Sequence, residues 1–178
     1  MTLCRYAMTA AALVALVAMP ARSAQAQQLE PTTHFGLSGG LNIPLSDLSR
    51  QAQTGYIIDG MVQGTPQGFP VALRGELSYT GFAGKSHQVS QNITSLGVNA
   101  VLPLMPQGDA PYFIGGVTLN HVSTFAGLSS ENDFGFNFGG GVQWDLGDMR
   151  TFAELRYMYV AHSGASRQML PLTFGVLF

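Results

Sequence analysis

Two short stretches of the 178-residue chain carry opposite charges at a spacing of two residues. Arg74 precedes Glu76, and Glu154 precedes Arg156. Side chains two positions apart point to the same face of a β-strand, so each stretch would present one cation beside one anion. Such pairs either neutralise one another in a buried interior or line a path for ions or protons. We expect the first role, in which the charges neutralise one another, because buried charges without partners are very costly.

A histidine next to a serine is the second candidate for chemistry. His162 is followed by Ser163, and Ser166 comes three residues after that. A histidine within hydrogen-bond reach can activate a serine hydroxyl. These residues resemble the His-x-Ser motif of outer-membrane lipid A deacylases, and this resemblance would imply a lipid A-modifying hydrolase. Adjacent strand residues point to opposite faces, and no acidic residue is clearly placed to orient the imidazole. We therefore expect a polar loop here and no enzyme activity.

Other reactive residue types are sparse. The four histidines (34, 87, 121 and 162) show no paired spacing that would hold a metal ion. We predict no metal and no cofactor. The net charge of −2 and the lack of a basic run argue against a nucleic-acid partner. Only 10% of the residues are charged, against about 25% in an ordinary soluble domain, which disfavours a cytosolic globular enzyme.

Residues 1–26 have the pattern of a secretory signal peptide. Arg5 supplies the positive charge, an apolar run spans Ala7 to Met19, and Ala24-Gln25-Ala26 fits a cleavage site. The apolar run is shorter than the roughly 20 residues that a membrane-spanning helix needs. Cleavage would leave residues 27–178 as one domain. It would also remove the only cysteine, Cys4.

Apolar and polar residues alternate in eight segments of the remaining chain, and turn-forming residues separate the segments. The segments are 34–43, 56–63, 71–80, 95–102, 112–120, 134–146, 154–159 and 170–178. This pattern predicts an all-β meander. We expect an eight-stranded antiparallel up-and-down transmembrane β-barrel whose apolar face points outward to lipid. The alternative is a soluble lipocalin-like barrel, which would turn the apolar face inward and bind an apolar ligand.

Two features of the segments favour the membrane form. The polar face consists mainly of small residues, which suit a narrow lumen, and large aromatics gather near the segment ends, as at membrane interfaces. The predicted interface aromatics are Phe35, Tyr56, Tyr79, Phe113, Trp144, Tyr157 and Tyr159. If the first strand starts in the periplasm, the connections on the outer side are Pro44–Thr54, Gly81–Gln91, Val122–Asp133 and His162–Arg167.

In such a barrel the two charged stretches lie on the third and seventh strands, which face each other across the lumen. Buried charges without partners are very costly. We therefore expect one lumen ionic cluster that closes the barrel. Its predicted members are Arg74, Glu76, Glu154, Arg156, Asp59 and Asp145.

The C-terminal part resembles small bacterial outer-membrane β-barrel proteins of the outer membrane protein A-like, eight-stranded type. Phe152-Ala153-Glu154-Leu155-Arg156-Tyr157, a short loop and the run from Leu170 to Phe178 look like the last hairpin of that family. Thr173 stands where the family often has glycine. The residues similar to the family's assembly signal are Leu170, Leu172, Phe174, Val176 and Phe178.

This resemblance implies an integral protein of the outer membrane of a Gram-negative-type cell. The implied partners are outer-membrane lipids, the outer-membrane assembly machinery and periplasmic chaperones. We expect a monomer with a structural or interaction role and a lumen plugged by side chains, since no residue pattern points to turnover chemistry.

Overall fold

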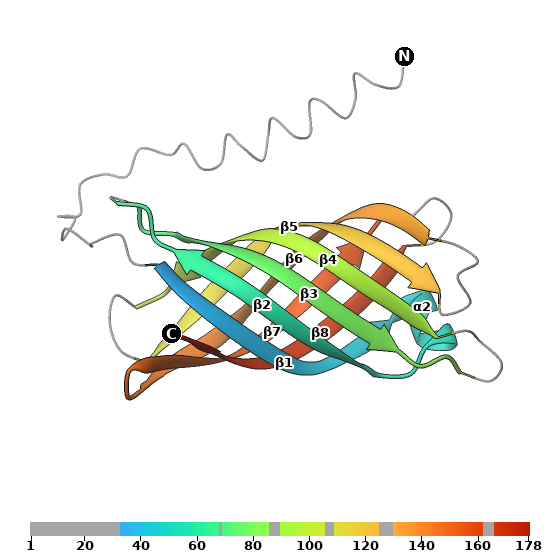
Figure 1. The fold of residues 1–178 in the computed structure, drawn as a ribbon, viewed down its shortest axis with the longest axis horizontal. Coiled ribbons are helices and arrows are strands. Elements are labelled where there is room, and N and C mark those ends of the chain that lie inside the picture. The colour runs from blue at the N-terminus through green and yellow to red at the C-terminus, as the bar shows by residue number, and fades with distance from the viewer. Residues whose placement is uncertain (1–32, 68, 86–89, 106–108, 125–129, 162–165) are drawn as a thin grey trace, which may run out of the picture.

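The computed structural model describes residues 33–67, 69–85, 90–105, 109–124, 130–161 and 166–178. Eight strands form one closed antiparallel barrel in which each strand pairs with its neighbours in sequence and β1 pairs with β8 (Figure 1). The elements are β1 (Thr33–Leu45), α2 (Ser46–Gln51), β2 (Gly55–Gly64), β3 (Ala72–Phe82), β4 (Gln91–Pro103), β5 (Ala110–Thr124), β6 (Ser130–Leu146), β7 (Met149–Val160) and β8 (Arg167–Leu177). The predicted fold class is confirmed. The predicted signal peptide lies outside the described residues.

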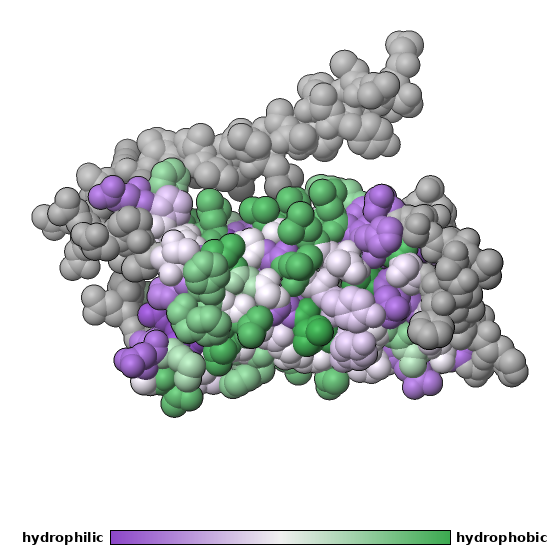
Figure 2. All heavy atoms as spheres, viewed as in Figure 1, coloured by the Kyte–Doolittle hydropathy of each residue, from purple (hydrophilic) through white to green (hydrophobic). Residues whose placement is uncertain are grey.

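The barrel turns its apolar face outward. Leu73, Leu155 and Phe174 are 51%, 46% and 56% exposed, whereas Arg74 and Glu154 are each 1% exposed. Hydrophobic side chains gather on the middle of the face seen in Figure 2, and hydrophilic ones gather near both ends. The soluble lipocalin-like alternative, which needs the opposite orientation, is therefore wrong.

The two ends of the barrel differ in how the strands are connected. At one end, here called the turn end, Gly147 and Asp148 alone join β6 to β7. Gly147 has a φ of +66°, which glycine adopts without steric cost. At the other end, here called the loop end, the connections include α2 (Figure 1).

The sequence did not predict α2. A helix of six residues is shorter than two turns, so it shows no apolar repeat that could be recognised. Contacts with the segment after β3 hold it in place: the Lys85 ammonium donates a hydrogen bond to the Ser49 carbonyl at 2.7 Å, and the Lys85 amide donates to the Gln51 carbonyl at 2.8 Å. Among the described residues, no helix is long and apolar enough to cross a membrane.

Candidate functional site: the barrel lumen

The middle of the lumen contains a closed ring of two arginines and two glutamates, which we call the ionic ring. Arg74 on β3 lies 2.9 Å from Glu154 on β7, and Arg156 on β7 lies 2.6 Å from Glu76 on β3. Two same-strand pairs complete the ring, Arg156 with Glu154 at 2.8 Å and Arg74 with Glu76 at 3.5 Å. The four side chains are between 0% and 4% exposed. The ring thus joins strands on opposite sides of the barrel.

Neutral side chains add hydrogen bonds to three members of the ionic ring. The Arg74 Nε donates to the Gln63 side-chain oxygen at 2.8 Å, the Asn99 amide donates to Glu76 at 2.8 Å, and the Tyr112 hydroxyl donates to Glu154 at 2.6 Å. A buried ion pair offsets its desolvation only when such further bonds satisfy the remaining donors and acceptors. Arg74, Glu76 and Glu154 each have one such further bond.

Aromatic rings and glycines give the ionic ring its shape. The Arg74 guanidinium lies 5.8 Å from the Tyr112 ring centre and 5.1 Å from that of Phe152, within the range of cation–π attraction. Across the β6–β7 pair, Gly139 faces Arg156 and Gly141 faces Glu154. A Cβ on Gly141 would come within 2.6 Å of the Tyr112 hydroxyl oxygen. These glycines therefore leave room for the long side chains of the ring.

The two aspartates that we assigned to the cluster lie in different places. Asp59 points into the lumen, is 3% exposed and accepts a hydrogen bond from Ser38 at 2.7 Å. Asp145 is instead an exposed residue at the turn end, where it lies 3.0 Å from Arg150. Its position in the alternation is inward, but it belongs to the last residue pairs before the β6–β7 turn. Its inclusion in the lumen ionic cluster was wrong for this reason.

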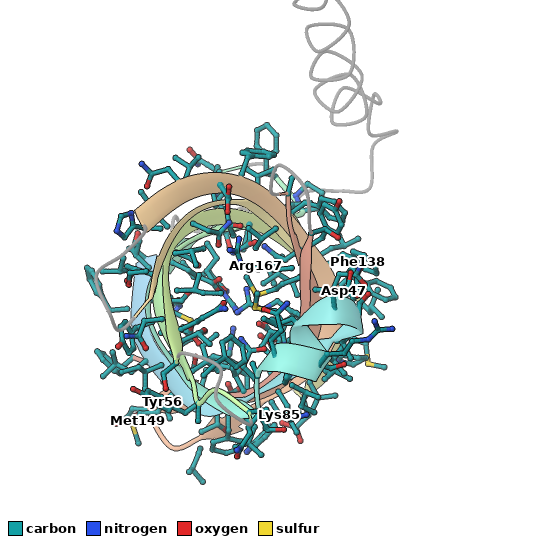
Figure 3. All side chains as sticks on the ribbon, turned by 90° about the vertical axis from the view of Figure 1, so that its right-hand side faces the viewer. Asp47, Tyr56, Lys85, Phe138, Met149 and Arg167 are labelled. Atoms are coloured by element: carbon teal, nitrogen blue, oxygen red, sulfur yellow. The ribbon has the colours of Figure 1, made fainter. Side chains whose placement is uncertain are left out.

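The loop end of the lumen is filled by apolar side chains, which we call the loop-end layer. Leu48 from α2 inserts among inward-facing strand residues and is 4% exposed. Figure 3, which looks into this mouth of the barrel, shows α2 lying across part of the opening and side chains that point into the interior behind it. The members are Leu48, Ala52, Phe82, Ile93, Val122, Met158, Val160 and Met169.

A second apolar group, the turn-end layer, fills the opposite end of the lumen. Phe152 and Tyr112, which lie beside Arg74, connect this layer to the ionic ring. Its members are Met61, Ala72, Val101, Tyr112, Ile114, Phe152 and Leu177. We expected small and polar side chains throughout the lumen. The sequence does contain large apolar residues at inward positions, such as Ile57 beside the outward Ile58, and these indicate that parts of the lumen are apolar.

The predicted interface aromatics all project from the barrel's outer surface. Phe35, Phe113 and Tyr56 are 60%, 58% and 53% exposed. Several of these side chains pair with neighbouring rings, as in Tyr56–Tyr79 at 6.2 Å and Trp144–Phe174 at 5.6 Å between ring centres. The ring centre of Tyr157 lies 5.3 Å from that of Phe138, and the ring centre of Tyr159 lies 5.1 Å from that of Phe136. The outer wall of β6 and β7 is therefore rich in aromatic side chains.

The predicted assembly-signal residues share the outward face of β8 and the residue after it. Leu172, Phe174 and Phe178 are 47%, 56% and 56% exposed, and Leu170 and Val176 are half-buried. Phe178 also exchanges two backbone hydrogen bonds with Phe35. The C-terminal end is thus joined to the start of β1.

The structure gives no support to the hydrolase alternative. His162 and Ser163 lie outside the described residues, and Ser166 precedes β8 in a half-buried position. Among the described residues, no group of three or more His, Cys, Asp or Glu side chains is placed to hold a metal ion.

A closed, eight-stranded antiparallel barrel with an apolar outer wall is the architecture of the small outer-membrane β-barrels. Residues 9–178 match the family described as "Outer membrane protein beta-barrel domain", and the chain belongs to this family. None of the curated proteins matches it.

Several solved structures share the fold. Neisserial surface protein A (NspA) is 16% identical, with a TM-score of 0.64, over 84% of this chain and 98% of that chain. The N-terminal β-barrel domain of OprF from Pseudomonas aeruginosa is 16% identical with a TM-score of 0.52, over 84% of this chain and 100% of that one. Ail, the attachment invasion locus protein of Yersinia pestis, is 13% identical with a TM-score of 0.52 and the same coverage. At these identities the likeness shows the fold alone.

Proposed function

We propose that this outer-membrane barrel has a structural or interaction role and that its lumen does not conduct. The observation that carries the proposal is the ionic ring, which links β3 to β7 across the lumen. An eight-stranded barrel is just wide enough for its interior to be filled by side chains. An ion entering this lumen would have to separate buried pairs of opposite charge.

The two apolar layers support the same conclusion. A hydrated ion must lose water to pass an apolar constriction, and such constrictions close channels by excluding water. Here one apolar layer lies on each side of the ionic ring. Three successive barriers of two kinds therefore stand in the path of an ion.

The proposal includes the orientation and maturation of the chain. Residues 1–26 act as a signal peptide and are removed, and residues 27–178 form the barrel domain. The loop end faces outward, in line with the longer outer loops of such barrels, and carries α2 to the cell surface. The turn end faces the periplasm, and the outward aromatics anchor the barrel in outer-membrane lipid.

Assembly requires further partners in this proposal. The outward row that ends at Phe178 is the signal for the outer-membrane assembly machinery, and periplasmic chaperones protect the chain before insertion. Unpaired strand edges and the exposed large hydrophobic residues, of which there are 28 among those that the structure describes, explain this need. The assembled barrel works as a monomer, since its strands close on themselves.

Planar-bilayer recording tests the closed lumen. We expect the purified wild-type barrel, refolded and checked for heat-modifiable gel migration, to produce no channel current in the bilayer. Arg156→Ala is expected to destabilise the barrel more than it changes conductance. Large, stable pores formed by the wild-type protein would overturn the proposal.

A further inference from the structure

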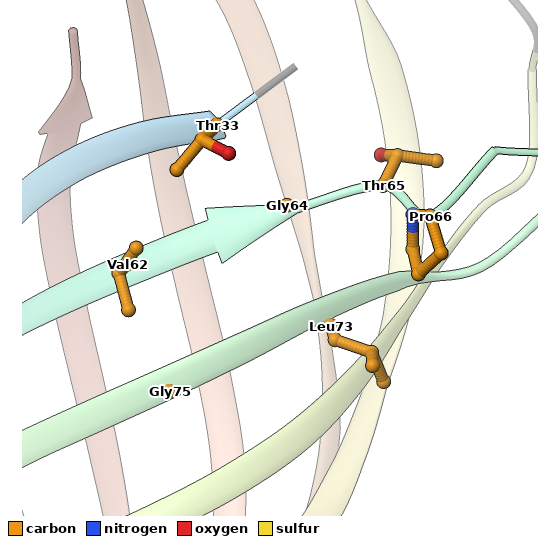
Figure 4. Close-up of a pocket in the computed structure, with 7 residues that line it drawn as sticks. All are labelled: Thr33, Val62, Gly64, Thr65, Pro66, Leu73 and Gly75. Carbon is orange, nitrogen blue, oxygen red and sulfur yellow. The ribbon is translucent and has the colours of Figure 1, made fainter. Parts of the chain in front are cut away.

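A depression of about 440 Å³ lies on the outer wall of the barrel at the turn end (Figure 4). Val62 on β2 and Leu73 and Gly75 on β3 form its walls, while Thr33 and Thr65 border it where the chain leaves the strands. The volume falls in the range of roughly 300–1,000 Å³ that is typical of ligand pockets. It is open on the side that faces the bilayer.

Gly75 makes the depression, and the packing of the protein does not require a glycine there. A Cβ on Gly75 would meet a single heavy atom within 4 Å, the Val62 Cγ1 at 3.5 Å, which is an ordinary contact. Inside the barrel the opposite holds, because a Cβ on Gly139 would come within 2.2 Å of the Leu155 carbonyl oxygen. The space beside Gly75 is therefore available to a molecule outside the chain.

The lining of the depression indicates which molecule fits. Val62 and Leu73 are 42% and 51% exposed and continue the lipid-facing wall of the barrel, so the space is continuous with the surface that lipid covers. Thr33 and Thr65, which carry hydroxyls, lie at its border, where β1 begins and just after β2 ends. None of the described residues that line it is charged, whereas anionic headgroups are recognised by clusters of Lys and Arg.

We propose that this depression binds one acyl chain of a zwitterionic phospholipid from the periplasmic leaflet. The chain lies over Gly75 between Val62 and Leu73, and the headgroup accepts hydrogen bonds from Thr33 and Thr65. The leaflet assignment rests on the orientation given under the proposed function. The binding site itself rests on the shape and chemistry of the depression.

Native mass spectrometry of the folded barrel tests this site, with phosphatidylethanolamine and phosphatidylglycerol added in equal amounts. The wild-type barrel is expected to retain one phosphatidylethanolamine molecule. Gly75→Leu, which fills the depression, is expected to lose it. Gly115→Leu is the matched control, because Gly115 also faces outward and a Cβ there would have its nearest contact at 3.5 Å; this variant is expected to keep the lipid. All variants must first show heat-modifiable migration.

A second pair of variants tests the headgroup contact. Thr33→Val and Thr65→Val keep the shape of the side chains and remove the hydroxyls, and they are expected to weaken retention of phosphatidylethanolamine. Equal retention in the Gly75→Leu and Gly115→Leu variants would overturn the site, and so would preferential retention of phosphatidylglycerol. A wild-type dimer that Gly75→Leu abolishes would assign the surface to a second copy of the chain and also overturn it. These outcomes are separate from bilayer conductance, which tests the closed lumen.

Discussion

In the middle of the lumen two arginines and two glutamates meet, whereas at both ends apolar side chains pack together. The ionic ring depends on the direction of its bonds and on the balance of its charges, since a missing member leaves an uncompensated charge in the buried interior. An apolar layer loses stability in proportion to the contacts and volume removed. Substitutions in the two regions should therefore differ sharply in cost for a similar change in size.

The largest effect is expected from Arg156→Ala. This change removes one partner of Glu76 and one of Glu154 and leaves two buried glutamates with one arginine. It should lower the free energy of unfolding by about 3–5 kcal/mol. Urea unfolding in lipid vesicles, followed by fluorescence of the single tryptophan, Trp144, gives the measurement. Glu76→Gln combined with Arg156→Met should cost less than the sum of the two single changes. A loss below about 1 kcal/mol for Arg156→Ala, as at an exposed ion pair, would contradict this account of the ring.

A smaller effect is expected from Leu48→Ala in the loop-end layer. Truncating a buried leucine costs about 2–5 kcal/mol, and the lower end applies because α2 is short and can settle into the space. Gln51→Ala, at an exposed position on the same helix, is the control and should leave unfolding unchanged. Neither variant should produce channel current in planar bilayers, because the ionic ring remains. Conductance in the Leu48→Ala variant would show that the layer, rather than the ring, closes the lumen.

Ile93→Val should reduce stability by about 0.5–1.5 kcal/mol, since it removes one methylene group from a side chain that is 2% exposed. The same change at Ile58, which is 56% exposed on the outer wall, should stay within about 0.5 kcal/mol. The same unfolding assay compares the two variants. Equal losses at both positions would mean that the interior is no better packed than the lipid-facing side.

The smallest effect is expected from Asp145→Asn at the turn end. The Asp145–Arg150 pair is 54% and 40% exposed, and pairs of this kind contribute roughly 0–1 kcal/mol. Added salt should reduce even this difference, because exposed charges are screened. A loss as large as that of Arg156→Ala would require the pair to be shielded from water in the membrane.

The sequence predicted the barrel because strict alternation reports directly on which side of a strand each residue lies. The same logic placed Arg74, Glu76, Glu154 and Arg156 on opposing strands with complementary order, as the structure arranges them. Alternation carries no information on depth along the axis. Asp145 was therefore assigned to the lumen although its height places it in water.

The apolar layers and α2 could not be predicted for a related reason. Inward residues such as Ile93 and Met169 look like irregularities in a polar face until the cross-section of the closed barrel is known. Helix α2 is held by the packing of Leu48 among strand residues and by hydrogen bonds from Lys85, which lies after β3. These contacts arise only in the folded barrel. Both features depend on tertiary structure.

The seam between β1 and β8 has a consequence for the order of events in folding. Its register pairs Gly36 with Leu177 and Leu45 with Gln168, residues that lie far apart along the chain. Pairing of this kind carries a large loop-closure entropy and slows folding. Until the last strand docks, the growing sheet keeps two open edges that can recruit other chains. The barrel cannot close without this pairing, so we expect a lesion in β8 to leave the preceding hairpins formed but the barrel open.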